Sequence, residues 1–107
     1  MVIKSMILSK EELIKRIKDN KDIISSFGVK NIGIFGSFAR NEAKEDSDID
    51  IIVEFEKGKA TFKNVGGLID FLEKLFKRNI DLLTPDGIES IRIKYLREQI
   101  KREVEFI

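Results

Sequence analysis

Two short motifs in the sequence contain the residue types that bind phosphate and divalent metal ions. Gly36-Ser37 follows one apolar run, Asp48-Ile49-Asp50 begins the next, and ten residues separate Ser37 from Asp48. A glycine lets the backbone approach a phosphate, and a serine hydroxyl with the first amides of a following helix can donate to it. Aspartates at alternate positions of a strand point to the same face. The two motifs therefore predict a phosphate-binding turn beside two carboxylates.

A third carboxylate is expected nearby, on the strand around Asp81, where Ile80 and Leu82 take the opposite face. Three carboxylates within a few ångströms repel one another, which should raise at least one pKa in the metal-free protein. Two Mg²⁺ ions roughly 3.5–4 Å apart could relieve this repulsion and stabilise the attacking and leaving oxygens of an in-line phosphoryl displacement. The candidate catalytic and metal-binding residues are Asp48, Asp50 and Asp81, and the candidate nucleotide-binding residues are Gly36 and Ser37.

Each motif also has an ordinary interpretation when it is taken alone. A Gly-Ser pair before a helix is commonly a capped turn, and Asp-x-Asp on a strand edge is commonly solvated. The two motifs together, at this spacing, favour a nucleotide- and metal-binding site over these two ordinary interpretations. Arg40, on the short helix after Ser37, has two open roles: it could contact a phosphate or pair with an acid of the sheet.

Composition narrows the chemistry further. The chain has no cysteine and no histidine, which excludes disulfides, thiol chemistry, histidine catalysis and the usual zinc sites. A metal held by oxygen ligands alone is expected to be Mg²⁺ or Mn²⁺. The net charge of +1 offers no general attraction for nucleic acid, so we expect no direct nucleic-acid partner.

Length and hydropathy predict a single domain over residues 1–107. No apolar run approaches the roughly 20 residues of a membrane span, and the N-terminus lacks a signal-peptide pattern. We therefore expect a cytoplasmic protein with no membrane contact.

The elements that must position these residues follow from hydrophobic periodicity and capping signals. Ser9 and Glu12 form a capping-box pattern after a short apolar lead-in over residues 1–8. Helices are predicted from this cap to about residue 26, briefly after Gly36, over 61–77 and over 90–101, with a turn at 85–87. Strands are predicted over residues 30–35, 48–55, 79–84 and 103–107.

The connection lengths predict how the first three strands pair. About a dozen residues join the first two, which suits antiparallel pairing, and a whole helix joins the second to the third, which suits a parallel crossover. This gives an α+β fold with a small mixed sheet, helices on one face and acids on the other. Phe35, Ile52 and Leu83 would share the acid-bearing face, partly exposed, as a possible contact surface.

The combination of Gly36-Ser37, a ten-residue interval and Asp48-x-Asp50 resembles the signature of the DNA polymerase β-like nucleotidyltransferase superfamily. The small size, the Gly-Ser-x-Ala-Arg motif and the Ser-Asp-Ile-Asp-Ile run resemble its minimal nucleotidyltransferase branch. The resemblance implies the nucleotidyltransferase (polymerase β palm-like) fold. Asn41 stands where family members often have glycine after the arginine, and asparagine tolerates a left-handed backbone, so this departure does not change the expected fold.

The resemblance also implies a role for each matching residue. Gly36 and Ser37 would bind the triphosphate of ATP, with Asp48 and Asp50 holding two Mg²⁺ ions. Asp81 would bind the catalytic metal and help to deprotonate the attacking hydroxyl.

Minimal nucleotidyltransferases are commonly paired with HEPN-domain toxins, so the resemblance implies an antitoxin that transfers AMP from ATP to a toxin tyrosine. The chain leaves few residues for an acceptor-binding domain, which favours an acceptor presented by another chain. Two alternatives stay open: a non-catalytic antitoxin that neutralises its partner by binding, and a nucleotidyltransferase acting on a small molecule. A homodimer or a hetero-oligomer would suit these functions.

Overall fold

The computed structural model describes residues 8–107, so nearly all of the predicted lead-in lies outside the described residues. Six helices are present: α1 (Lys10–Asp19), α2 (Lys21–Ser26), α3 (Gly36–Ala39), α4 (Phe62–Phe76), α5 (Pro85–Glu89) and α6 (Lys94–Glu103) within this range. The same range contains four strands: β1 (Val29–Phe35), β2 (Ile49–Phe55), β3 (Ile80–Leu83) and β4 (Glu105–Phe106).

Side-chain caps fix where three helices begin. The Ser9 hydroxyl accepts a hydrogen bond from the Glu12 amide at 3.0 Å, as the capping pattern predicted. Thr61 caps α4 and Thr84 caps α5 through the same kind of bond. The turn predicted at residues 85–87 is thus the start of a short helix. The helix predicted up to residue 26 is interrupted at Asn20, which separates α1 from α2.

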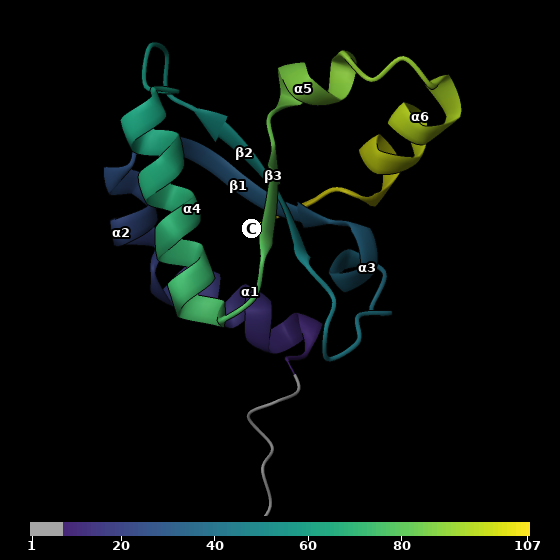
Figure 1. Ribbon diagram of the computed structural model, residues 1–107, viewed down its shortest axis with the longest axis horizontal. Helices are drawn as coiled ribbons and strands as arrows, with labels where there is room; N and C mark the ends of the chain where they lie inside the picture. The colour runs from purple at the N-terminus through teal and green to yellow at the C-terminus, as the bar shows by residue number, and fades with distance from the viewer. Residues whose placement is uncertain (1–7) are drawn as a thin grey trace, which may run out of the picture.

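The four strands form one mixed sheet in the order β3-β2-β1-β4. Strands β1 and β2 are antiparallel, and β2 and β3 are parallel, as the connection lengths predicted. The register pairs Phe35 with Asp50 and Asp50 with Asp81. The end of β1 therefore meets the start of β2 and β3 at one corner of the sheet (Figure 1).

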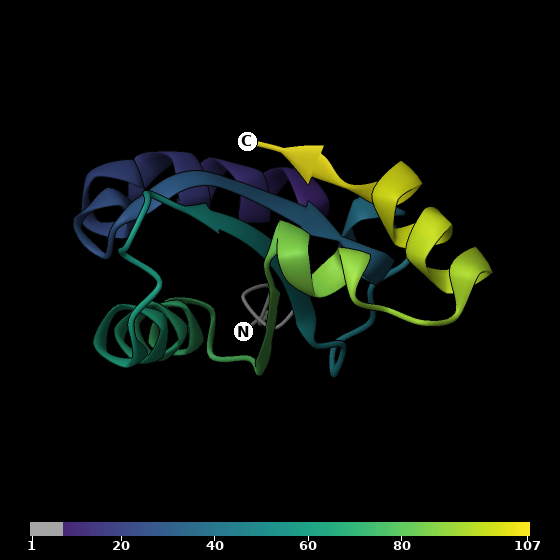
Figure 2. The same cartoon turned by 90° about the horizontal axis from the view of Figure 1, so that it is seen from above.

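One face of the sheet packs against α1, α2 and α4, which lie on the same side of the strands in Figures 1 and 2. The inward residues of the strands alternate, as in Ile49, Ile51 and Val53 on β2, and all three are fully buried. Leu68 and Leu72 of α4 and Leu13 and Ile17 of α1 complete this cluster. The core therefore holds β2 rigidly and fixes the direction of its alternate residues.

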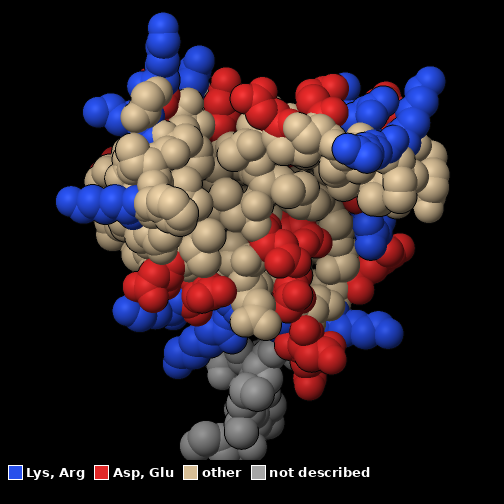
Figure 3. All heavy atoms as spheres, turned by 45° about the horizontal axis from the view of Figure 1, so that its top comes forward, with Lys and Arg blue, Asp and Glu red and all other residues tan. Residues whose placement is uncertain are grey.

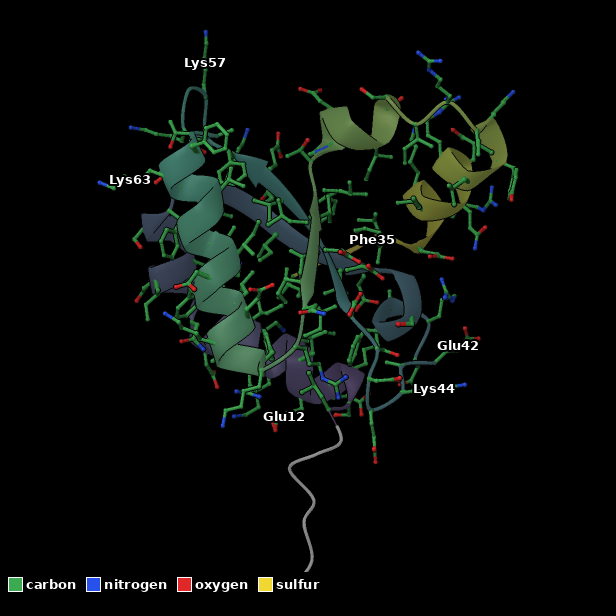
Figure 4. All side chains as sticks on the ribbon, viewed as in Figure 1. Glu12, Phe35, Glu42, Lys44, Lys57 and Lys63 are labelled. Carbon is green, nitrogen blue, oxygen red and sulfur yellow. The ribbon has the colours of Figure 1, made fainter. Side chains whose placement is uncertain are left out.

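The opposite face is also partly covered, by α5 and α6. Phe35 and Ile52 are buried at 7% and 4% exposure and pack with Ile88 of α5. The prediction that these side chains of the acid-bearing face would be partly exposed is wrong for both, because Ile88 of α5 and Ile100 of α6 pack against them. Figure 4 shows Phe35 on the side of the sheet where α5 and α6 lie. Leu83 is half-buried, as predicted, and at the Asp50 end of the face Asp50 is half-buried and Asp81 is exposed.

We searched residues 8–107 for helices long and apolar enough to cross a membrane, and none of those helices qualifies.

Candidate active site at the corner of the sheet

The turn at Gly36 brings the chain from β1 directly into α3. Gly36 has φ +71°, a backbone conformation that favours glycine because other residues place Cβ against their own carbonyl. After α3, the Glu42 amide donates a hydrogen bond of 2.8 Å to the Ser37 carbonyl oxygen, which holds the end of this turn. Asn41 has φ +60°, a left-handed conformation that asparagine tolerates.

Gly36 also lies directly against the Asp50 carboxylate. A Cβ added at Gly36 would stand 2.9 Å from Asp50 Cγ and closer still to its Oδ2. Asp50 is in turn the register partner of Asp81, and Asp48 lies two residues before it on the chain. The structure thus brings the Gly36 turn, Asp50 and Asp81 to one corner of the sheet, as the connection lengths and strand alternation predicted.

The charges at this corner act on one another. Burial, together with the Asp81 carboxylate that is hydrogen-bonded to it, raises the pKa of Asp50 to about 6. Asp48 raises the same pKa further, and the Arg40 guanidinium lowers it. Figure 3 shows one group of acidic side chains near the middle of this face and others along its upper edge and lower left, with Lys and Arg mostly toward the margins. Negative charge concentrated in this way attracts a divalent cation.

The donor set fits Mg²⁺ or Mn²⁺ in its chemistry, although it is not assembled as a ready-made trio. Asp50 and Asp81 stand side by side on neighbouring strands, and a hydrogen bond joins their carboxyl groups. Both could supply oxygen ligands to a metal ion. Within residues 8–107, no three acidic side chains are grouped closely enough to hold a metal ion as they stand. Asp48 is exposed and precedes the first residue of β2, so it is not part of the ladder that pairs Asp50 with Asp81.

Arg40 pairs with two carboxylates that lie outside the strands. Its Nη1 donates to Glu103 Oε1 and its Nε to Glu42 Oε1, both at 2.9 Å. The suggested pairing of Arg40 with an acid of the sheet is therefore replaced by pairing with the loop after α3 and with the end of α6. Glu103 lies 63 positions from Arg40, and no local pattern in the sequence pointed to this contact.

Comparison with known proteins identifies the family. Residues 10–107 match the model of the nucleotidyltransferase domain. The chain belongs to the nucleotidyltransferase family. The protein adenylyltransferase MntA of Thermococcus cleftensis is 42% identical to it over 81 residues, which are 75% of this chain and 81% of the relative. A Methanocaldococcus jannaschii protein, also named as a protein adenylyltransferase, is 37% identical over 91 residues, 84% of this chain and 88% of the relative.

Solved structures show the same fold. A minimal nucleotidyltransferase superposes with a TM-score of 0.71 at 33% identity, covering 92% of this chain and 95% of that one. A toxin–antitoxin structure with AMP-PNP gives a TM-score of 0.58 at 22% identity, over 92% of this chain and 72% of that one. The predicted minimal nucleotidyltransferase family and its α+β fold are thus confirmed.

A residue of this nucleotidyltransferase that sequence reasoning missed is Arg78. Its Nη1 donates to the carbonyl oxygens of Lys44 and Ser47 at 3.1 and 3.0 Å, and its guanidinium lies 5.5 Å from the centre of the Phe38 ring. Arg78 therefore ties the loop before Asp48 to the start of β3. A single arginine after a helix carries no pattern that would reveal these contacts.

A cleft of about 390 Å³ opens beside this loop. It is lined by residues 45–48, the end of α4 and residues 77–79, and of the candidate residues it contains only Asp48. The remaining candidates lie at the corner formed by Gly36, Asp50 and Asp81 rather than in this cleft.

The metal-free nucleotidyltransferase should lose stability as pH rises from about 4 to about 6. Asp50 keeps its proton in the folded state over this range, whereas in the unfolded chain it ionises near its ordinary pKa of 3.8. The folded state then binds more protons, so the free energy of unfolding falls with increasing pH. We expect about 1–2 kcal/mol from Asp50 after allowing for its partial exposure to solvent.

Urea unfolding of the wild type and of Asp50→Asn, at about pH 4 and about pH 7 without metal, isolates this contribution. The stability of the wild type relative to the variant should be lower at the higher pH. An equal difference at both pH values would contradict the assignment.

Proposed function

We propose that this chain is a protein adenylyltransferase that transfers AMP from ATP to a hydroxyl group of a partner protein. The observation that carries the proposal is the contact of Gly36 with Asp50 and the pairing of Asp50 with Asp81. Relatives 37–42% identical over most of the chain are named protein adenylyltransferases, which supports the same activity here.

In this proposal Gly36, Ser37 and Arg40 bind the triphosphate, and Asp48, Asp50 and Asp81 hold two Mg²⁺ ions. Bound Mg²⁺ would neutralise the charge that develops on the phosphate oxygens. The partner hydroxyl oxygen attacks the α-phosphorus, the bond to the β-phosphate oxygen breaks, and pyrophosphate leaves. Asp81 is exposed at the open end of the sheet, where an incoming hydroxyl can reach it, and it accepts the proton.

The acceptor we propose is a tyrosine of a HEPN-domain toxin, with this chain as its antitoxin in the cytoplasm. Structures of toxin–antitoxin complexes share the fold of this chain at 20–22% identity. The chain would act as one minimal domain and rely on a hetero-oligomer to present the tyrosine to the corner at Asp50.

A second candidate, neutralisation by binding alone, has its own supporting observation. Three apolar side chains at the start of α6 are exposed: Ile93 at 55%, Tyr95 at 73% and Leu96 at 38%. Such a cluster suits contact with a partner protein. Tyr95 is therefore not part of the core, and the contact surface we favour is on α6 rather than on the acid-bearing face.

The experiment incubates this chain with the protein encoded next to it, Mg²⁺ and each nucleoside triphosphate in turn, followed by mass spectrometry of both chains. We expect the partner to gain one AMP moiety on a tyrosine, with ATP as the donor. A partner that is inhibited yet unmodified would favour binding alone, and modification by a phosphate group would refute nucleotidyl transfer.

A further inference from the structure

Arg40 is placed so that its guanidinium could block the carboxylates that are proposed to bind metal at this site. Arg40 belongs to the same turn as the candidate metal ligands: its amide donates to the Gly36 carbonyl oxygen at 3.0 Å, and Gly36 lies against the Asp50 carboxylate. A guanidinium beside two adjacent carboxylates forms strong paired hydrogen bonds with them. If Arg40 turned to Asp50 and Asp81, it would occupy the oxygens that a divalent cation needs.

The structure shows Arg40 held by two other carboxylates instead. Glu42 accepts from Nε and Glu103 from Nη1, each at 2.9 Å. Glu42 is on the loop after α3 and points outward in Figure 4, and Glu103 is the last residue of α6. Both ion pairs draw the guanidinium to carboxylates that lie outside the strands.

Of the two acids, Glu103 is the one in a position to hold Arg40 firmly. Its side chain is 15% exposed, against 66% for Glu42, and exposed ion pairs contribute little. Its second oxygen, Oε2, accepts from Gln99 Nε2 at 3.0 Å, and its carboxylate also accepts from the Gly36 amide. Burial alone would raise the pKa of Glu103, but these donors lower it, so it is ionised when it binds Arg40.

We propose that Glu103 is a positioning residue that holds the Arg40 guanidinium away from the Asp50–Asp81 pair and so leaves this pair open to a metal ion. The inference rests on the metal-binding role in the proposed function. If the inference is right, the end of α6, which is remote in sequence from both motifs, helps to form the site.

The test measures Mn²⁺ binding to the full chain without nucleotide, by the electron paramagnetic resonance signal of free Mn²⁺. Glu103→Gln should weaken Mn²⁺ binding about tenfold, within the range typical of residues that orient metal ligands. Glu98→Gln is the matched control, because Glu98 lies on the same helix and pairs with Arg97 and Lys101 instead. It should leave Mn²⁺ affinity unchanged.

A second substitution separates positioning from a structural role. Adding Arg40→Gln to Glu103→Gln removes the released guanidinium and should restore Mn²⁺ affinity to that of Arg40→Gln alone. A purely structural role of Glu103 would not be rescued in this way, since the double variant restores no contact. If Glu103→Gln does not fold, Glu103→Asp replaces it in the test. This variant keeps the negative charge on a shorter side chain, so it should lose less Mn²⁺ affinity than a variant without the charge.

The outcomes distinguish this inference from the function on which it rests. Unchanged Mn²⁺ affinity in Glu103→Gln, or a loss that Arg40→Gln does not restore, overturns the positioning role alone. Wild-type Mn²⁺ affinity equal to that of Asp50→Asn overturns the metal site, and with it both proposals.

Discussion

Replacing Asp50 with asparagine should reduce AMP transfer by about a thousandfold while leaving the protein folded. Asparagine has nearly the shape of aspartate but lacks the charge that would bind the metal. The loss of charge also removes the repulsion between Asp50 and its carboxylate neighbours, so the metal-free variant should be at least as stable as the wild type at neutral pH. Transfer from α-labelled ATP and urea unfolding measure the two effects.

Asp70→Asn is the control for this prediction, because Asp70 lies on α4 and pairs with Lys74 on the surface of the helix. It should retain full transfer. Full transfer by Asp50→Asn would refute the catalytic assignment. If the variant transfers no AMP and still inhibits the partner to the same extent, then binding rather than transfer is the antitoxin activity.

Replacing Gly36 with alanine should destabilise the protein by about 2–4 kcal/mol and abolish transfer. The added Cβ would need the space occupied by the Asp50 carboxylate, and φ +71° is unfavourable for alanine. The clash can be relieved only by moving β1 away from β2 or turning Asp50 out of the site, and the unfavourable φ remains in either case. Chemical unfolding of the variant, with transfer measured in parallel, tests this prediction.

Gly66 provides the matched glycine control. It lies within α4, and a Cβ added there would meet no atom within 4 Å. Gly66→Ala should therefore stabilise the protein by about 0.5–1 kcal/mol through its higher helix propensity and leave transfer unchanged. Equal effects of the two substitutions would show that the fit between Gly36 and Asp50 is not special.

Local patterns predicted those parts of the site that depend on nearby residues. Strand alternation placed Asp81 opposite Ile80 and Leu82, and the lengths of the two connections gave the pairing that makes it the neighbour of Asp50. The serine cap at residue 9 followed from the local capping pattern. These predictions succeeded because each rests on backbone geometry that a few consecutive residues decide.

Contacts between distant segments could not be predicted in this way. The pairing of Glu103 with Arg40 joins the last helix to the third, and Ile88 covers Phe35 only because α5 folds back over the sheet. The alternation of β2 indicates which face Ile52 takes, but it contains no information about which later helix covers that face. The prediction of exposure failed for this reason.

The most direct test of the central claim is a crystal structure with Mn²⁺ and AMP-PNP, with the metal located by its anomalous scattering. Our account predicts a Mn²⁺ peak between the carboxylates of Asp50 and Asp81, with the triphosphate on the Gly36–Ser37 turn. Metal and triphosphate located together in the cleft formed by residues 45–48 and 77–79, with Asp50 and Asp81 free of metal, would contradict it.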